Sequence, residues 1–283
     1  MSFFIAEVSS NHSRDIDRAI EFIDSASKVG CDAVKFQLFK IEKLFSAEIL
    51  ENSKQHRDRK QWELPLDFVP LLSNRCKEKG IQFSCTPFYL DAVNELESYV
   101  DFYKIASYEL LWDQLLIACA RTGKPVIIST GMANLGEIKH AVKVLRNNNC
   151  EPIVLHCTSA YPTPYKEANL SAIETIRKST GCEAGWSDHT VDPGVVHRAI
   201  HKWDARVIEF HLDLEGKGEE FESGHCWLPD QIGSVIKQVR HAKDADGDGI
   251  KEPVPSEISD LLWRTDPTDG LRPHKSIRNS FKS

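Results

Sequence analysis

The residues best suited to chemistry lie where short apolar runs end. His189 ends the run at 184–189, and His211 ends the next one, at 206–211. If the two runs are neighbouring parallel strands, both imidazoles can hold one cation. Neutral imidazoles, with water and substrate oxygens, suit Mn²⁺, Zn²⁺ or Fe²⁺ better than Ca²⁺. Two strand-end histidines bonded to the backbone are the alternative, and His225, which follows no strand, is a weaker candidate.

Two lysines end the second and fourth apolar runs. Lys35 and Lys104 lie at positions where a lysine is rarely buried unless it is paired. Together they indicate an anionic substrate, either a phosphate or a carboxylate. One snorkelling lysine and one ion-paired lysine are the alternative. Hydroxyls at Ser129 and Ser187, each near the start of a predicted helix, also suit phosphate oxygens.

Two carboxylates accompany these groups. Glu7 ends the first run, where a lone carboxylate inside a barrel needs a cation such as Lys35 or Lys104. It is a candidate general acid or base, and a structural salt bridge is the alternative. Glu209 lies two residues before His211, on the same side of the strand, where it could hold a metal-ligating histidine or a metal-bound water in place. It is our second candidate catalytic carboxylate.

Eight apolar runs must position these groups, and segments with helical spacing separate them. Alternating strands and helices predict parallel strands joined by right-handed crossovers. Eight such units favour a closed (β/α)8 TIM barrel, whose strands all end on one face. An open doubly wound sheet is the alternative, but no glycine-rich loop follows the first strand. The runs are 3–7, 33–37, 81–86, 102–104, 125–131, 153–159, 184–189 and 206–211.

The chain predicts a single barrel domain over residues 1–245. Residues 246–283 are polar and rich in proline and glycine, so we expect an extended C-terminal tail there. The stretch 41–63 is rich in Lys, Glu, Asn and Gln and predicts a long loop over the second strand. Such a loop is either functional or a solvated insertion.

Composition narrows the class of protein. The 283 residues carry a formal net charge of −7, which supports neither nucleic-acid nor anionic-membrane binding. We find no signal peptide and no apolar run of membrane-spanning length. The eight cysteines are scattered without a CxxC pair, so we expect reduced thiols and a cytoplasmic protein.

Several segments resemble the sialic acid synthase family, which condenses phosphoenolpyruvate (PEP) with an aldehyde sugar. The most specific are HCTSAYPTP at 156–164 and WSDHT at 186–190. The others, in chain order, are 5–8 with 11–12, 34–37, 86–88, 103–105 with Ser107 and Glu109, 129–132, and 208–211. The resemblance covers roughly residues 3–240.

The resemblance implies a role for each matching position. It implies that C3 of PEP adds to the sugar aldehyde, that a metal ion polarises that carbonyl, and that PEP is cleaved at C–O. The implied metal ion is Mn²⁺, with Mg²⁺, Co²⁺ and Zn²⁺ as alternatives. The implied residues are His189 and His211 for the metal; Lys35, Lys104, Ser107, Ser129, Ser159 and Ser187 for PEP; Gln37, Glu109 and Tyr161 for the sugar; and Glu7 as a catalytic carboxylate.

The chain departs from the family pattern in three places. Ser9 follows Val8 where the family usually has a glycine. Residues 213–227 replace the usual loop after His211, and Glu222 is our candidate there for the family's sugar-contacting aspartate. The chain also stops before the small antifreeze-like domain that follows the barrel in the family. From the resemblance we expect PEP and an N-acetylmannosamine-like amino sugar or another aldose as substrates. A barrel with a different acceptor, or one that needs a partner protein for turnover, is the alternative; a homodimer is one oligomeric option.

Overall fold

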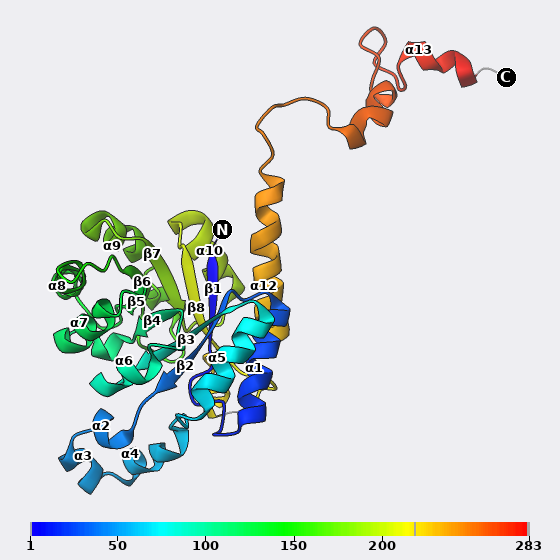
Figure 1. Cartoon of the computed structure of the whole chain (residues 1–283). Helices are drawn as coiled ribbons and strands as arrows, with labels where there is room; N and C mark the ends of the chain where they lie inside the picture. Colours follow the sequence, from blue (N-terminus) through cyan, green and yellow to red (C-terminus); the bar gives the residue numbers. More distant parts are fainter. Residues whose placement is uncertain (1, 218, 282–283) are drawn as a thin grey trace. The chain divides into compact units, whose positions relative to one another are not determined.

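The chain folds into a closed barrel of eight parallel strands (Figure 1). The computed structural model describes residues 2–217 and 219–281. Neighbouring strands follow the chain order from β1 to β8, and β8 closes the barrel by pairing with β1, with Glu7 opposite His211. The predicted (β/α)8 TIM barrel is confirmed. The strands are β1 (Phe3–Glu7), β2 (Ala33–Leu38), β3 (Gln82–Pro87), β4 (Phe102–Ile105), β5 (Val126–Ser129), β6 (Ile153–Cys157), β7 (Ala184–Asp188), β8 (Val207–Leu212) and the short β9 (Cys226–Trp227), which pairs with β8.

Helices surround the barrel and bury one apolar stripe each against the strands. In the first, Asp15 accepts hydrogen bonds from the first-turn N–H groups of residues 17 and 18, and Gly30 ends the helix in the left-handed conformation, as its position in the sequence predicts. Ala19, Phe22, Ile23 and Ala26 form its buried stripe. The surrounding helices are α1 (Ile16–Val29), α5 (Phe68–Lys79), α6 (Leu90–Leu96), α7 (Asp113–Arg121), α8 (Leu135–Arg146), α9 (Ala172–Thr180), α10 (Pro193–Trp203) and α12 (Pro229–Ala242).

The barrel interior has an apolar layer and a polar layer. Alternate side chains of a strand lie on the same side, so residues two apart both point inward. The packed apolar layer consists of Ile5, Ala33, Phe102, Ile127, Leu155 and Val207. Two residues further along the same strands come Glu7, Lys35, Lys104, Ser129, Cys157 and Glu209. Strand geometry therefore gathers the polar side chains at the carboxyl ends of the strands, above an apolar floor.

The strand β7 needs a glycine beside β8. A Cβ on Gly185 would lie 2.3 Å from the carbonyl oxygen of Val207, so no larger residue fits. Ser187, two residues further along β7, then lies in the polar layer.

Residues 41–62 form short helices rather than the irregular loop that we expected. They lie beyond the end of β2 and are coloured blue at the lower left of Figure 1. The elements are α2 (Ile41–Leu44), α3 (Ala47–Asn52), α4 (Lys54–Asp58) and the 3₁₀ turn η1 (Arg59–Trp62). We call residues 41–62 the insertion.

The chain divides into two compact units, Met1–Arg240 and His241–Ser283. The second unit contains η4 (Lys243–Ala245), η5 (Pro255–Trp263), α13 (Lys275–Arg278) and η6 (Asn279–Phe281). Within it, the Asp266 carboxylate accepts hydrogen bonds from the backbone N–H groups of Thr268 and Lys275. Across the described residues of the chain, no helix is both long and apolar enough to span a membrane. All eight cysteines are free and buried, as expected for reduced thiols.

Candidate active site

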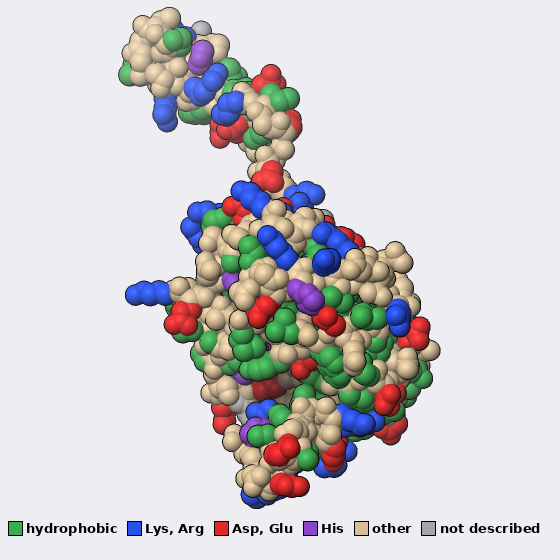
Figure 2. Space-filling model, turned by 90° about the vertical axis from the view of Figure 1, so that its left-hand side faces the viewer, with side chains coloured by type: hydrophobic (Ala, Val, Ile, Leu, Met, Phe, Trp, Pro, Cys, Tyr) green, Lys and Arg blue, Asp and Glu red, His purple; other side chains and the backbone are tan. Residues whose placement is uncertain are grey.

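A cavity of about 720 Å³ opens at the carboxyl ends of the strands and is bordered by the insertion. Figure 2 shows a hollow in this part of the molecule with acidic side chains inside it. Of the residues that the sequence singled out, Ser159 and Glu222 do not line the cavity. Those that do are Glu7, Lys35, Gln37, Lys104, Ser107, Glu109, Ser129, Tyr161, Ser187, His189, Glu209 and His211.

Lys35 and Glu7 form a buried ion pair on neighbouring strands. Thr86 accepts a hydrogen bond from the Lys35 ammonium at 3.2 Å, and Gln37 donates to Oε1 of Glu7 at 2.9 Å. Burial lowers the pKa of Lys35 to about 8, against the opposing effect of the Glu209 charge. Lys35 therefore remains protonated at neutral pH, and the pairing predicted for Glu7 is present.

Lys104 and Glu209 form a second buried pair across the barrel, with Nζ 3.4 Å from Oε1. Burial alone would raise the pKa of Glu209, but the charges of Lys104 and Lys35 outweigh it and hold the pKa below its usual value. Ser187 lies 3.4 Å from the same carboxylate oxygen. The other oxygen of Glu209, Oε2, is buried without a hydrogen-bond partner. Two carboxylates, on β8 and β1, and two lysines, on β2 and β4, thus lie together at the bottom of the cavity.

A group of serine hydroxyls lies beside the lysines. Gly131 donates its backbone N–H to the Ser107 hydroxyl at 3.0 Å. A Cβ at position 131 would lie 2.0 Å from the Ser159 hydroxyl, so a larger residue would displace that side chain. The hydroxyl oxygens of Ser129 and Ser159 are buried without partners. Of the two, Ser129 lines the cavity together with Lys35 and Lys104, and its hydroxyl suits an oxygen of a phosphate or a carboxylate.

His189 and His211 both present one ring nitrogen to the cavity. Nδ1 of His189 lies 2.8 Å from the backbone carbonyl of Thr158, which can only accept, so this nitrogen carries the proton. Nδ1 of His211 lies 3.1 Å from a carboxylate oxygen of Glu220. Each ring therefore keeps Nε2 as a lone-pair donor, the arrangement that orients metal-ligating histidines. The ring centres are 5.5 Å apart.

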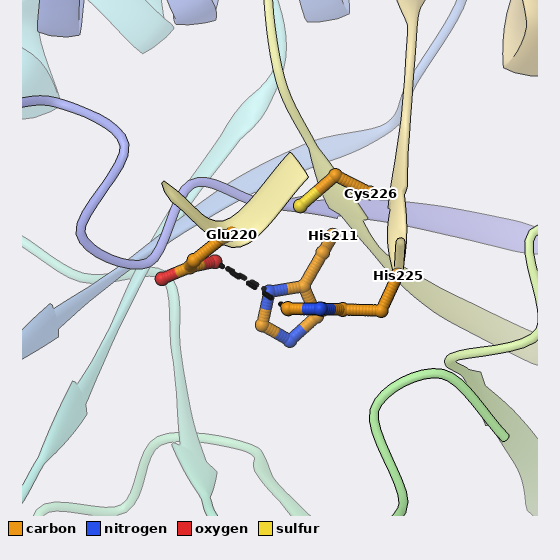
Figure 3. Close-up of side chains that lie close together, drawn as sticks. All are labelled: His211, Glu220, His225 and Cys226. Carbon is orange, nitrogen blue, oxygen red and sulfur yellow. Dashed lines mark hydrogen bonds and ion pairs between the residues drawn. The ribbon is translucent and has the colours of Figure 1, made fainter. Parts of the chain in front are cut away.

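Glu220 and His225 extend this pair (Figure 3). Ligand atoms of His211, Glu220, His225 and Cys226 all lie within 4.8 Å of one another. The first three line the cavity, whereas Cys226 does not, and burial raises the pKa of its thiol well above the usual range. A thiol that stays protonated is a poor metal ligand. The cluster that could hold a metal ion therefore comprises His211, Glu220 and His225, with His189 beside them.

The protonation states of this cluster suit metal binding. Burial lowers the pKa of His189 to about 3 and also lowers the pKa of His211, so both rings are neutral near pH 7. Burial would raise the pKa of Glu220, but hydrogen bonds with His211 and His225 hold it well below its usual value. Neutral imidazoles and an ionised carboxylate are the forms that bind divalent cations.

A buried carboxylate fixes the loop that carries His189. Asp188 is fully buried and accepts hydrogen bonds from the indole N–H of Trp186 at 3.0 Å and from the hydroxyl of Thr190 at 2.7 Å. Its other oxygen accepts from the indole of Trp227 at 2.9 Å. Since Trp227 lies on β9, Asp188 ties the end of β7 to the strand that follows the 213–225 loop.

A second buried carboxylate fixes the loop that carries Glu220. Asp213 is fully buried, accepts from the backbone N–H of Gly216 at 2.7 Å, and lies 3.3 Å from the Arg18 guanidinium. Glu220 itself accepts from the backbone N–H and the hydroxyl of Ser10 at 3.2 and 2.7 Å. The loop is thus bonded to α1 and to the segment after β1.

The predicted sugar-binding residues are only partly brought together. Burial raises the pKa of Glu109 to about 7, and its Oε2 is buried without a partner. Tyr161 is 43% exposed, and its ring lies against His189 at a tilt of 37°, with ring centres 4.2 Å apart. Glu222 is exposed on α11 (Glu219–Glu222) and lies outside the cavity, because the loop turns Glu220 inward instead.

Sequence reasoning missed Glu220, ranked His225 low, and did not consider Arg59, which also lines the cavity. All three lie on loops or in the insertion, where no strand spacing marks an inward position. The pairing of Glu220 with His211 over nine residues follows only from the path of the loop.

Comparisons with known proteins agree with this architecture. Residues 22–251 match the NeuB family. The chain is 33% identical to an N,N'-diacetyllegionaminic acid synthase of Campylobacter jejuni, a match that covers 92% of this chain and 82% of that protein. It is 30% identical to a pseudaminic acid synthase of the same species, with 87% and 75% covered.

Solved structures agree as well. The N-acetylneuraminic acid (sialic acid) synthetase of Leptospira borgpetersenii has a TM-score of 0.80 and 31% identity to this chain, covering 95% of this chain and 93% of that one. The names of these three relatives all describe the synthesis of an acidic sugar. The chain therefore belongs to the NeuB family and is a barrel enzyme of that family.

Proposed function

We propose that this enzyme condenses PEP with the aldehyde of an N-acetylmannosamine-like amino sugar, releasing phosphate and a nonulosonate-type acidic sugar. One observation carries the proposal. A single cavity holds two buried lysine–carboxylate pairs, the unpartnered hydroxyl of Ser129, and two neutral histidines whose Nε2 atoms can act as ligands. The lysines and hydroxyls suit the phosphate and carboxylate of PEP, and the histidines suit a metal ion.

The donor set fits a divalent metal ion. We propose that His189 and His211 hold it, with Glu220 and His225 either as further ligands or as the groups that orient His211. Imidazole and carboxylate ligands suit Mn²⁺, Zn²⁺ or Co²⁺, and Mn²⁺ is our first choice. When bound, such an ion would act as a Lewis acid on the carbonyl group of the acceptor.

PEP binding follows from the charges at the bottom of the cavity. Lys35 and Lys104 supply two positive charges, which the carboxylates of Glu7 and Glu209 balance. Bound PEP adds the negative charges that this layer can accommodate with the hydroxyl donors of Ser129. In the dry interior of a barrel these contacts are stronger than they would be in water.

The proposed reaction balances with one water molecule. C3 of PEP bonds to the aldehyde carbon, whose oxygen gains a proton, and water adds to C2 before phosphate leaves with the bridging oxygen. Glu209 offers a buried oxygen without a partner, so we assign it to accept the proton of that water. Glu7, bonded to Gln37 and Lys35, is placed to hold a hydroxyl of the acceptor or to return a proton to it.

Phosphate release from PEP tests the proposal. The assay uses a panel of aldoses that includes N-acetylmannosamine, with the enzyme stripped of metal and then supplied with Mn²⁺. We expect release only with acceptor and metal together. PEP labelled with ¹⁸O at the bridging position should deliver the label to phosphate, because the C–O bond breaks.

The metal assignment has its own test. His189→Ala should abolish the Mn²⁺-dependent rate, while retained activity would contradict our choice of ligand. PEP binding without release for any acceptor would favour the alternative, a binding barrel that needs a different acceptor or a partner protein for turnover.

A further inference from the structure

Arg59 is a cation of the insertion, and no ion pair joins it to another of the described residues. It begins η1 and lines the cavity. Its guanidinium carbon lies 5.6 Å from the ring centre of Phe45 and 5.5 Å from that of Trp62. Its Nε is buried and has no hydrogen-bond partner. Aromatic contacts hold the plane of a guanidinium and leave the N–H groups on its edge free for a ligand.

The neighbouring cations of the segment 54–60 are all engaged elsewhere. Lys54 forms an ion pair with Asp58, and Lys60 forms one with Glu42. The Arg57 guanidinium donates hydrogen bonds to the backbone carbonyl oxygens of Leu50 and Glu51. Of these four basic residues, only Arg59 lines the cavity. The insertion therefore presents one free guanidinium to the substrate space.

No carboxylate of the described residues forms an ion pair with Arg59. The other cations of the cavity, Lys35 and Lys104, already have carboxylate partners. Glu109 lines the same cavity and has an unpartnered oxygen, yet it does not pair with Arg59. A buried N–H without an acceptor is costly, so a ligand that supplies an acceptor is expected to bind there.

We propose that Arg59 binds an anionic group, a phosphate or a carboxylate, at the end of the acceptor sugar remote from its aldehyde. The inference rests on the proposed function. In that function Lys35 and Lys104 hold PEP inside the barrel, so the aldehyde points inward and the far end of the sugar points toward the insertion. The edge of a guanidinium makes two parallel hydrogen bonds with a phosphate or carboxylate, which one hydroxyl group cannot match.

Three acceptors test this directly: N-acetylmannosamine, its 6-phosphate, and N-acetylmannosaminuronic acid, which carries a carboxylate at C6. We expect kcat/KM to be at least about tenfold higher for an anionic acceptor than for the neutral sugar. The better of the two anionic acceptors identifies the group as phosphate or carboxylate. A preference for the neutral sugar would overturn the inference.

Variants of Arg59 separate recognition from structure. Arg59→Met should lower kcat/KM for the anionic acceptor about 10- to 100-fold, through KM, while changing the neutral acceptor and PEP less than about threefold. Arg59→Lys should restore part of the loss. Lys54→Met, in the same insertion but outside the cavity, is the matched control and should leave all three acceptors unchanged. An equal loss for neutral and anionic acceptors in Arg59→Met would contradict anion recognition.

Absence of turnover with every acceptor would contradict the proposed function rather than Arg59 alone. Calorimetric titration of the 6-phosphate into the full-length enzyme then decides the inference. Wild-type enzyme should bind it at least about tenfold more tightly than Arg59→Met. Equal affinity, or no binding by either protein, would overturn the assignment.

Discussion

Inside the barrel, functional side chains lie two residues beyond apolar ones on the same strand, whereas the loops reach the cavity without any such spacing. The pairs Ile5 with Glu7 and Phe102 with Lys104 show the strand pattern. Glu220 and Arg59, in contrast, come from the 213–225 loop and the insertion. We call the residues on the strands the strand set and those on the loops and the insertion the loop set. Backbone hydrogen bonds between strands hold the strand set in place, while individual buried groups such as Asp213 hold the loop set. We therefore expect changes in the strand set to abolish chemistry and changes in the loop set to alter metal and acceptor binding.

The largest effect should come from Lys104→Met in the strand set. It removes a cation from the proposed PEP site and leaves Glu209 buried without its 3.4 Å partner. We expect kcat/KM for PEP to fall about 10²- to 10³-fold, and the free energy of unfolding to fall by about 3–5 kcal/mol. Phosphate release and chemical denaturation measure the two effects, with Lys139→Met on the exposed face of α8 as control.

A double variant separates those two effects. Lys104→Met with Glu209→Gln leaves no unpaired charge from this pair, so stability should recover while activity does not. Recovery of activity would show that the strand-end charges serve the fold rather than PEP.

An intermediate effect is expected for Glu220→Gln in the loop set. The change removes the negative charge that hydrogen-bonds His211, so Mn²⁺ affinity should fall about 10- to 100-fold in calorimetric titrations. Glu222→Gln is the matched control, because it lies on the same short helix but is exposed. If Glu222→Gln weakened Mn²⁺ binding and Glu220→Gln did not, the loop assignment would be wrong.

The smallest effect concerns Glu109, whose pKa burial raises to about 7. If its ionised form accepts hydrogen bonds from the acceptor, KM for the acceptor should rise up to about tenfold from pH 8 to pH 6. Glu109→Gln should flatten that profile. An unchanged profile in the variant would assign the pH dependence to another group.

The raised pKa of Glu109 also predicts how this residue affects the stability of the fold. Its pKa is higher in the folded than in the unfolded state, so between about pH 4.5 and 7 the unfolded state binds fewer protons. The contribution of Glu109 to stability therefore falls as pH rises through this window and is constant above it. Denaturation midpoints of wild type and Glu109→Gln are compared at pH 5 and pH 8. Relative to wild type, the variant should be more stable at pH 8 than it is at pH 5.

The sequence predicted the strand set better than the loop set. Lys35, Lys104 and His189 were found because an apolar run followed by a polar residue marks the end of a strand. The insertion was expected as a loop, although its residues form short helices that place Arg59 at the cavity. Its composition, rich in charged residues and without a long apolar stripe, carried no signal for where one guanidinium would lie.

The sequence by itself determined the barrel and most of its polar layer. Strand periodicity is a local property, and closure of eight parallel strands brings every strand end to one face. Only the tertiary structure decided that Glu220 rather than Glu222 enters the cavity, that His225 joins His211, and that Arg59 remains unpaired. Those outcomes depend on loop paths set by contacts between residues far apart in the chain, such as Arg18 with Asp213, which no local spacing encodes.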